Sequence, residues 1–498
     1  MALVRDPSHR VAAGLAPRRG TRRSIAACAV PAVLCLALAS CGGGGGGAGN
    51  GPPQLRVVDA VYDASSNYDV LVNSASAVTD MAYGQATTFQ AAQSGSNSVV
   101  FEPTGTTVTV LTASFSATTG YNDTVLALEG QSALAAVIVA QDNGAVSSGQ
   151  SRLSLVHACP QEASLDFYLT GPTDDLPASP SVPALTYTAS ASSALAPAVL
   201  TVSSGDYRLR AVATGDTTQT VVYDSGTITL ESGVDLLAAV VQTSGSAAPF
   251  SLMALDASSN VSQIADQRVQ LRMGNFAPAL GSVDTFLDTS GTSDSSATLF
   301  APGLDNGNVS GYQAVLPGSY RGSMAAAGST QEIVGAPLAL SPSTSVSVFA
   351  IGFSGQTGAA ALQLLTLLDD LTTPASGMAK LRVVLASPDV GTLSSSGTVD
   401  VVALDTSGSS PVISRRLVVN LAYAGASTYL SLAAGSYTIA LVPAGVDTPL
   451  LPSSSGVPVS LAAGTVNTIV VDGCEYPGSG VCASGANSLT LVPLDDTM

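Results

Sequence analysis

The chain has 498 residues, of which 46% are hydrophobic and 10% charged, and its formal net charge at pH 7 is −18. This acidic balance repels nucleic acid and anionic lipid headgroups, so it disfavours a phosphate-binding role. Abundant Val and Leu among Ser, Thr, Gly and Ala suit strands and tight turns rather than disorder, and the length predicts three to five domains.

The first 40 residues have the parts of an export signal. Arginines 18, 19, 22 and 23 precede an apolar run over residues 25–39. The run has about 15 residues, fewer than the ~20 that span a bilayer core, so we expect a cleaved signal peptide over residues 1–40. The leader contains six of the 17 basic residues and one of the 35 acidic residues, so its removal leaves a net charge of −23.

A short motif ends this leader. The run Leu38-Ala39-Ser40-Cys41 resembles the lipobox of bacterial lipoproteins, and Gly42 to Gly47 follow it. The resemblance implies cleavage before Cys41, a diacylglycerol on its thiol, and a further acyl chain such as palmitate; two or more chains anchor a protein stably. It also implies that Gly42 directs the protein to the outer membrane of a Gram-negative cell. Residues 41–53 are then a flexible tether. The alternative is an ordinary secretory signal in which Cys41 is incidental.

Three landmarks recur four times after the tether, which predicts a repeated domain. The first is an apolar strand start followed by an aspartate. The strand starts are Leu55, Leu153, Leu271 and Leu381, and the aspartates are Asp69, Asp166, Asp284 and Asp400. The second is an apolar residue before an aromatic one, at Tyr83, Tyr187, Phe300 and Tyr423. The third is a turn glycine, at Gly105, Gly205, Gly318 and Gly435, with Tyr207, Tyr320 and Tyr437 two residues after the last three.

These glycines are 100, 113 and 117 residues apart, which is the size of a whole domain. Short alternating runs bounded by turn residues predict all-β sandwiches. We expect unit 1 over 54–150, unit 2 over 151–266, unit 3 over 267–376 and unit 4 over 377–498, arranged in a row. Unit 1 is short and lacks an evident closing strand, so it either depends on a neighbour for a strand or does not fold alone. We assign residues 359–370 as a strand, although they could form a helix.

The landmarks resemble a bacterial family, domain of unknown function 4397. The matching segments are Val156-His157-Ala158-Cys159-Pro160 with Leu165-Asp166-Phe167-Tyr168, Ala386-Ser387-Pro388-Asp389, and Tyr423-Ala424-Gly425-Ala426-Ser427-Thr428-Tyr429 with Ala434-Gly435-Ser436-Tyr437. The resemblance covers most of the chain after about residue 54. It implies tandem Ig-like sandwiches on the cell surface and no assigned activity.

The cysteines suggest one disulfide. Cys474 and Cys482 are eight residues apart around turn residues, and in an exported protein this spacing predicts a disulfide across a loop. A zinc site would need two more ligands nearby, and none is evident. Cys159 is either a small buried residue at a strand end or a reactive thiol, and the first is favoured.

Catalytic side chains are scarce. After the leader the chain has one histidine, His157, and one lysine, Lys380, and it contains no Gly-x-Ser-x-Gly elbow. We expect His157 to be a hydrogen-bonded structural residue and Lys380 to be a solvated charge. We therefore expect no enzymatic activity, no metal and no cofactor.

The recurring residues have two interpretations. The four aspartates could bind calcium between units or accept backbone hydrogen bonds at strand entries, and their isolation favours the second. The loop over residues 305–308 only partly resembles a calcium loop, and the acidic pairs are 174–175, 369–370 and 495–496. The three tyrosines could stack on sugars or anchor sandwich corners through their hydroxyls, and the second is favoured.

The sequence therefore predicts an exported, lipid-anchored protein of the outer membrane or cell surface. We expect a non-catalytic structural, adhesion or partner-binding role, with the membrane as one partner through Cys41 and an envelope protein or glycan as another. The alternatives are a polysaccharide-binding or cell-wall-binding module and a hydrolase whose site is not recognised. Nucleic acid is not an expected partner.

Overall fold

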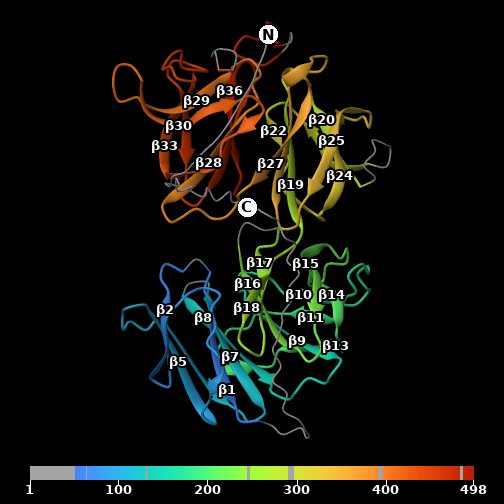
Figure 1. Cartoon of the computed structure of the whole chain (residues 1–498), viewed down its shortest axis with the longest axis vertical. Helices are drawn as coiled ribbons and strands as arrows, with labels where there is room; N and C mark the ends of the chain where they lie inside the picture. The colour runs from blue at the N-terminus through green and yellow to red at the C-terminus, as the bar shows by residue number, and fades with distance from the viewer. Residues whose placement is uncertain are drawn as a thin grey trace, which may run out of the picture.

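The computed structural model describes residues 51–497 except residue 63 and residues 131–132, 244–246, 290–296, 391–395 and 483–485. In this part of the chain eight β-sheets form four consecutive β-sandwiches (Figure 1). The predicted all-β class with tandem Ig-like sandwiches is confirmed. The signal peptide and Cys41 lie outside the described residues. None of the helical segments in the described ranges is long and apolar enough to cross a membrane.

Each unit combines two sheets, and we call the sheet that contains its first strand the inner sheet and the other the outer sheet. The inner sheet of unit 1 contains, in spatial order, β12 (Ser190–Leu195), β8 (Leu134–Asp142), β7 (Tyr121–Glu129), β1 (Gln54–Ala60) and β4 (Gln90–Ala91). Its outer sheet contains β3 (Ala75–Met81), β2 (Tyr68–Val72), β5 (Gly95–Pro103) and β6 (Leu111–Ala117).

Unit 2 repeats this arrangement. Its inner sheet contains β13 (Ala198–Ser203), β9 (Gln150–His157), β16 (Asp235–Gln242), β17 (Phe250–Leu255) and β18 (Val261–Ile264). Its outer sheet contains β11 (Val182–Leu185), β10 (Leu165–Thr170), β14 (Gly205–Ala213) and β15 (Val221–Leu230).

In unit 3 the first strand pairs with two short strands on one side. The inner sheet contains β22 (Asn308–Val309) and β23 (Gln313–Val315), then β19 (Val269–Phe276), β26 (Ser345–Ile351) and β27 (Gln363–Asp369). The outer sheet contains β21 (Thr298–Leu304), β20 (Val283–Asp288), β24 (Gly318–Ala326) and β25 (Glu332–Leu340). A short 3-10 turn, Gly358–Ala360, precedes β27, so the segment expected as a strand forms one after this turn.

Unit 4 follows the same plan. Its inner sheet contains β31 (Gly425–Ala426) and β32 (Leu430–Ala433), then β28 (Met378–Leu385), β35 (Val466–Asp472) and β36 (Thr490–Asp495). Its outer sheet contains β30 (Val412–Ala422), β29 (Thr398–Asp405), β33 (Gly435–Pro443) and β34 (Val457–Leu461). In every unit the first strand lies parallel to a later strand of the inner sheet: β1 to β7, β9 to β16, β19 to β26 and β28 to β35.

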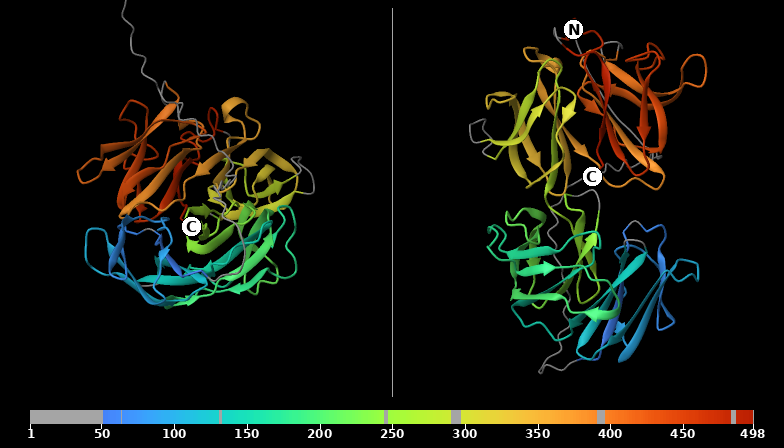
Figure 2. Two further views of the ribbon diagram at one scale, coloured as in Figure 1. Left: turned by 60° about the horizontal axis from the view of Figure 1, so that its bottom comes forward. Right: turned by 180° about the vertical axis from the view of Figure 1, so that it is seen from behind.

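The units are not arranged in a row as the sequence suggested. Units 1 and 2 lie side by side in one tier and units 3 and 4 in a second (Figures 1 and 2). Within each tier the inner sheets pack face to face. Val58 and Leu126 of unit 1 share an apolar cluster with Leu237 and Met253 of unit 2. A second cluster joins the inner sheets of units 3 and 4.

This packing explains burial patterns that alternation did not predict. β17, β19 and β26 are buried at every position, and β1 at every position after its first residue. An inner sheet meets its own outer sheet on one face and the neighbouring unit on the other, so both sets of side chains leave water. Burying apolar surface contributes about 25 cal/mol per Å², so the inter-unit clusters stabilise each tier.

Two expectations about unit 1 need correction. It has a closing strand, β8, and its turn glycine is Gly95 at the start of β5 rather than Gly105. Unit 1 also takes a strand from its neighbour, as one alternative proposed. β12 leaves unit 2, lies parallel to β8, and packs Ala194 against the core of unit 1.

Candidate functional site

His157 lies at the end of β9, and its ring has no free nitrogen for catalysis. Nε2 is 3.1 Å from the carbonyl oxygen of Ala163, and Nδ1 is 3.3 Å from the backbone nitrogen of Cys159. These contacts fit a neutral ring in which Nε2 donates and Nδ1 accepts. Burial lowers the pKa of His157, which also favours the neutral form. The geometry therefore supports a structural histidine rather than a general base.

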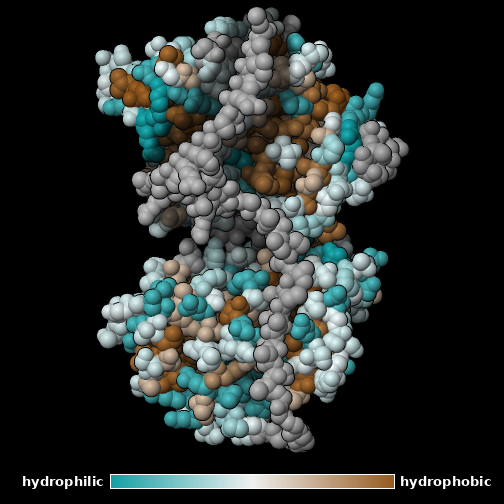
Figure 3. All heavy atoms as spheres, in the orientation of Figure 1, coloured by the Kyte–Doolittle hydropathy of each residue, from teal (hydrophilic) through white to brown (hydrophobic). Residues whose placement is uncertain are grey.

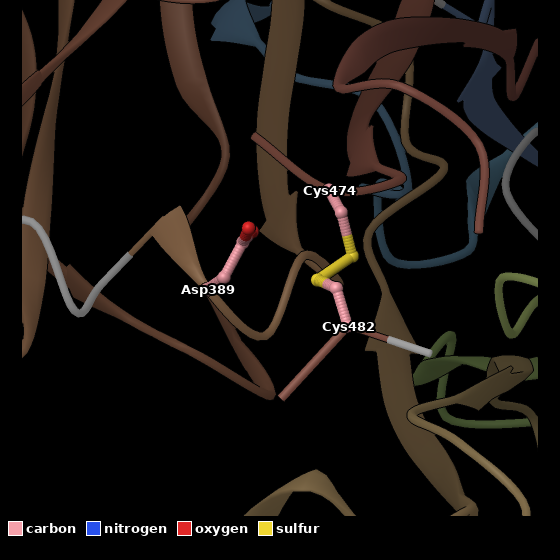
Figure 4. Close-up of side chains that lie close together, drawn as sticks. All are labelled: Asp389, Cys474 and Cys482. Atoms are coloured by element: carbon pink, nitrogen blue, oxygen red, sulfur yellow. A yellow bond between two sulfur atoms is a disulfide. The ribbon is translucent and has the colours of Figure 1, made fainter. Parts of the chain in front are cut away.

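The cysteines form one disulfide beside a buried carboxylate. The sulfur atoms of Cys474 and Cys482 are bonded, and Asp389 lies next to them (Figure 4). Because each sulfur is bonded to the other, neither is a thiolate that could bind a metal. Asp389 instead accepts the backbone N–H groups of Glu475 and Tyr476 at 3.1 and 2.9 Å, which shapes the disulfide loop.

The unpaired cysteine is shielded. Cys159 is buried at the end of the first strand of unit 2, and burial raises the pKa of its thiol to about 11, with Glu162 adding to the shift. A thiol with such a pKa is almost wholly protonated at neutral pH, so it is a poor nucleophile.

The four recurring aspartates perform the same structural task. Each lies near the start of the second strand of its unit and accepts the backbone N–H of a residue with a left-handed backbone conformation in the next strand of the outer sheet. The pairs are Asp69 with Asp80 (2.9 Å), Asp166 with Ala184 (2.7 Å), Asp284 with Gly303 (2.7 Å) and Asp400 with Asn420 (2.8 Å). The four residues that donate these N–H groups have φ values from +49° to +63°. The carboxylates therefore stabilise a β-bulge, which fits the structural interpretation.

The recurring tyrosines anchor corners. The hydroxyls of Tyr207, Tyr320 and Tyr437 each donate to the carbonyl oxygen four residues earlier, at 2.8, 2.9 and 2.8 Å. Their rings are half-buried against the cores of their units. In unit 1 Asn97 takes this place, and its amide donates to the carbonyl oxygen of Gln93 at 2.8 Å. These hydroxyl contacts and half-buried rings fit the corner-anchoring interpretation.

The charged side chains that the sequence left unassigned meet between units 3 and 4. Arg272 on β19 lies 2.7 Å from Asp496, which follows β36, and Arg382 on β28 lies 2.7 Å from Asp369 on β27. Each arginine therefore pairs with the carboxylate of the opposite unit. All four side chains are almost fully excluded from water. This reciprocal pattern is the one that a twofold axis between two similar domains generates.

Hydroxyl and aromatic groups complete this network. Ser347 lies opposite Arg272 in the parallel ladder, accepts from its Nε at 2.8 Å and donates to Asp369 at 2.7 Å. Thr468 takes the same place opposite Arg382 and donates to Asp496.

The residues of a Ser-x-Tyr motif, which belongs to the family resemblance at Ser427-Thr428-Tyr429, make the remaining contacts. The rings of Tyr312 and Tyr429 lie under the guanidinium groups of Arg272 and Arg382, 4.6 and 4.8 Å from centroid to Cζ. Their hydroxyls donate to Asp369 and Asp496 at 2.8 and 3.1 Å. Two residues before each tyrosine, a serine accepts a backbone N–H of the first strand. Ser310 accepts from Met273 and Ser427 from Val383, both at 3.0 Å. The motif therefore builds an inter-unit lock.

Units 1 and 2 carry half of this network. Arg56 on β1 donates to Thr124 at 2.9 Å and to the carbonyl oxygen of Asp256 in unit 2 at 2.5 Å, with the Phe89 ring 4.5 Å away. Burial lowers the pKa of this guanidinium to about 10, and nearby Asp256 opposes the shift. In unit 2, Ser154 stands where the other units have the arginine. Its partner in the parallel ladder, Leu237, stands where they have the hydroxyl residue.

Lys380 and the loop over residues 305–308 also make contacts within the fold. Lys380 was expected to be solvated, but its ammonium lies 2.8 Å from Asp370 and donates to Thr372. The loop over residues 305–308 forms a turn in which the Asn308 N–H donates to the Asp305 carbonyl oxygen, and Asn306 contacts Asn487 of unit 4. The acidic pairs 369–370 and 495–496, each following a run of apolar residues, were the sequence signal for the inter-unit network.

Two regions of the chain, residues 53–168 and 292–396, match the family model described as "Domain of unknown function (DUF4397)". The predicted family resemblance is confirmed over these two regions. No curated protein is similar in sequence to the chain.

Two solved structures share a faint likeness. The Bacillus anthracis TIE protein is 9% identical with a TM-score of 0.15, and the match covers 82% of this chain and 66% of that one. BcpA, the major pilin subunit of Bacillus cereus, is 9% identical with a TM-score of 0.13, and the match covers 65% of this chain and 99% of that one. This chain thus spans just under two thirds of the TIE protein. TM-scores this low support no inference about function.

Proposed function

We propose that this chain, which carries two DUF4397 regions, is a lipid-anchored, non-catalytic structural protein of the cell envelope. The observation that carries the structural role is the reciprocal burial of Arg272 with Asp496 and of Arg382 with Asp369. Four charges without water access favour one relative placement of the two sandwiches, because any other placement leaves charges buried and unpaired. A tier held in this way is a rigid body, which suits a scaffold that presents surfaces to partners.

The side chains that an enzyme would need are used within the fold. Both ring nitrogens of His157 contact backbone atoms, the thiol of Cys159 is buried, and Lys380 pairs with Asp370. General acid–base catalysis needs a group that can reach a substrate and change its protonation state. These contacts support a structural role over the hydrolase alternative.

The proposal of a lipid anchor depends on the lipobox resemblance, and the following experiment tests it directly. The protein is expressed in a Gram-negative host, and its intact mass and partition into detergent are measured beside Cys41→Ala. Cys28→Ala is the matched control, because Cys28 leaves with the leader. We expect a lipid-sized mass increment and membrane partition in the wild type and in Cys28→Ala, and loss of both in Cys41→Ala. A soluble wild-type protein cleaved elsewhere would overturn the anchor and make this a free secreted protein.

A further inference from the structure

One late strand of each inner sheet (β8, β17, β27 or β36) would end the sheet unless another strand paired with it, and three of these four strands are covered or interrupted. β12 pairs with β8 in unit 1, and β18 pairs with β17 in unit 2. β36 in unit 4 contains Pro493, which removes one backbone donor. An uncovered edge exposes unpaired N–H and C=O groups that can pair with another chain, so proteins protect such edges.

β27 in unit 3 has none of these protections. In the part of the chain that the structure describes, β26 is the one strand hydrogen-bonded to it; β25 (Glu332–Leu340) of the outer sheet lies close to β27 but does not pair with it. From Gln363 to Leu368 the strand contains neither proline nor a charged residue. Leu368 is 72% exposed, and Figure 3 shows hydrophobic atoms on the surface where Figure 1 places β27. An apolar, unguarded edge of this length is a typical site for strand pairing.

The structure also explains why no neighbouring strand pairs with the free edge of β27. In the first tier, β12 leaves unit 2 and pairs with β8 of unit 1. The first strand of unit 2, β9, has Ser154 at the position where the other units have an arginine. In the second tier, the corresponding segment of unit 4, β31, stays on β28, where Ser427 accepts the Val383 N–H and the Tyr429 ring lies on Arg382. The lock between units 3 and 4 therefore keeps this segment away from β27.

The sequence of β27, QLLTLLD, is nearly symmetric about its centre, Thr366. We propose that β27 is a self-association site, at which a second copy of this chain adds its own β27 antiparallel about a twofold axis through Thr366. Leu364 then lies opposite Leu368 of the second copy, and Leu365 opposite Leu367. Gln363 lies opposite Asp369, so no carboxylates face each other. A C2 interface requires such self-complementarity.

The contacts already made by β27 are compatible with this pairing. Leu365 and Leu367 pack against the apolar cluster between units 3 and 4, while Thr366 and Leu368 are exposed on the opposite face. Arg382 donates to the carbonyl oxygen of Leu368 at 3.0 Å, but a carbonyl oxygen has two lone pairs and can accept a second bond. One strand pair buries less than a standard interface, so the dimer is transient. The net charge of each copy opposes it, so salt strengthens it by screening.

Sedimentation of the exported chain carrying Cys41→Ala, over a range of protein and salt concentrations, tests the proposal. We expect a reversible monomer–dimer equilibrium that shifts toward dimer with added salt. Leu368→Lys should weaken the dimer at least tenfold, because a lysine on the edge opposes pairing. Leu299→Lys is the matched control, since Leu299 is 50% exposed on the outer sheet of the same unit, and it should behave as the parent. A parent that remains monomeric, or equal effects of the two lysines, would overturn the proposal.

Cross-linking then tests the axis. Thr366→Cys places one cysteine of each copy face to face, so mild oxidation should yield a disulfide-linked dimer, whereas Leu299→Cys should yield no disulfide-linked dimer under the same conditions. A dimer that forms in solution but is not trapped by Thr366→Cys would show that the copies associate through another surface. Pairing with a different protein in place of a second copy would appear as a monomeric parent in the sedimentation experiment.

Discussion

The guanidinium of Arg272 in unit 3 lies 2.7 Å from the carboxylate of Asp496 in unit 4, and both groups are buried. Arg382 and Asp369 make the same contact in the opposite direction. Two sandwiches that share four buried charges cannot separate without exposing or unpairing them. We therefore expect units 3 and 4 to unfold as one cooperative body rather than as two independent domains.

Removal of one partner from this network tests that expectation. Arg272→Met leaves the carboxylate of Asp496 buried without its cation, and such a loss costs about 3–5 kcal/mol. The double variant Arg272→Met/Asp496→Leu removes both charges and should recover most of the loss. Chemical denaturation monitored by tyrosine fluorescence gives the free energies of unfolding.

Arg321 provides the matched control for this series. It pairs with Glu332 at the surface of unit 3, where both side chains are about one fifth exposed, so Arg321→Met should cost under about 1 kcal/mol. Equal effects of Arg272→Met and Arg321→Met would contradict the importance of the buried network.

Asp123 gives unit 1 a pH-dependent stability. It is 1% exposed, its Oδ2 accepts no hydrogen bond from the described residues, and burial raises its pKa from 3.8 to about 6. Between about pH 4 and pH 6 the folded state binds more protons at this site than the unfolded state, so the contribution of Asp123 to stability falls as the pH rises through that window. Asp123→Asn should raise the Tm at pH 7.5 and have little effect at pH 4.

Asp405→Asn is the control, because the pKa of Asp405 is shifted in the opposite direction. Hydrogen bonds from Ser407 lower the pKa of Asp405, so its contribution is present above pH 4 and is lost only at lower pH. Thermal unfolding of both variants at pH 4 and pH 7.5 separates the two effects. An unchanged Tm for Asp123→Asn at pH 7.5 would show that the buried carboxylate is solvated.

Local features of the fold could be predicted from the sequence because their partners lie close along the chain. The hydroxyl of Tyr320 donates to a carbonyl four residues away, and Asp284 accepts from Gly303 at a separation of 19 residues, close to the 18 and 20 residues in units 2 and 4. The all-β class follows from the same short-range patterns of alternation and turn residues. Because these residues recur at equivalent places in the units, the sequence favoured a structural role over a binding role for them.

Contacts between units could not be predicted in the same way. Arg382 and Asp369 belong to different units, and in the sequence each has the pattern of a surface charge. β12 is rich in serine, so its pairing with β8 of unit 1 depends on an uncovered edge that only the structure shows. The runs that are buried on both faces, such as β19, require knowledge of the neighbouring unit.

The hydrogen bonds of the recurring aspartates predict that these residues stabilise the fold without calcium. Asp284 accepts the N–H groups of Gly303 and Gly328, both at 2.7 Å, and joins two hairpins of unit 3. Asp284→Ala should lower the free energy of unfolding by about 1–2 kcal/mol, because two charge-assisted bonds are lost at a half-buried site. Asp175→Ala, at an exposed loop position, should have no measurable effect. Millimolar calcium should leave the Tm of the wild type unchanged, and a calcium-dependent rise that Asp284→Ala abolishes would restore the metal interpretation.

The disulfide loop of unit 4 contributes to the contact with unit 3. Phe353, which follows β26, packs on Cys474 and Cys482 in a small buried cluster. Closure of this short loop should stabilise the chain by about 2–3 kcal/mol through the entropy of the unfolded state. Cys474→Ser/Cys482→Ser should show this loss in denaturation and faster hydrogen exchange at residues 353–362 of unit 3. Phe353→Ala keeps the disulfide, so it should reproduce the faster exchange while leaving the loop closed. Unchanged exchange in both variants would mean that the disulfide acts only within unit 4.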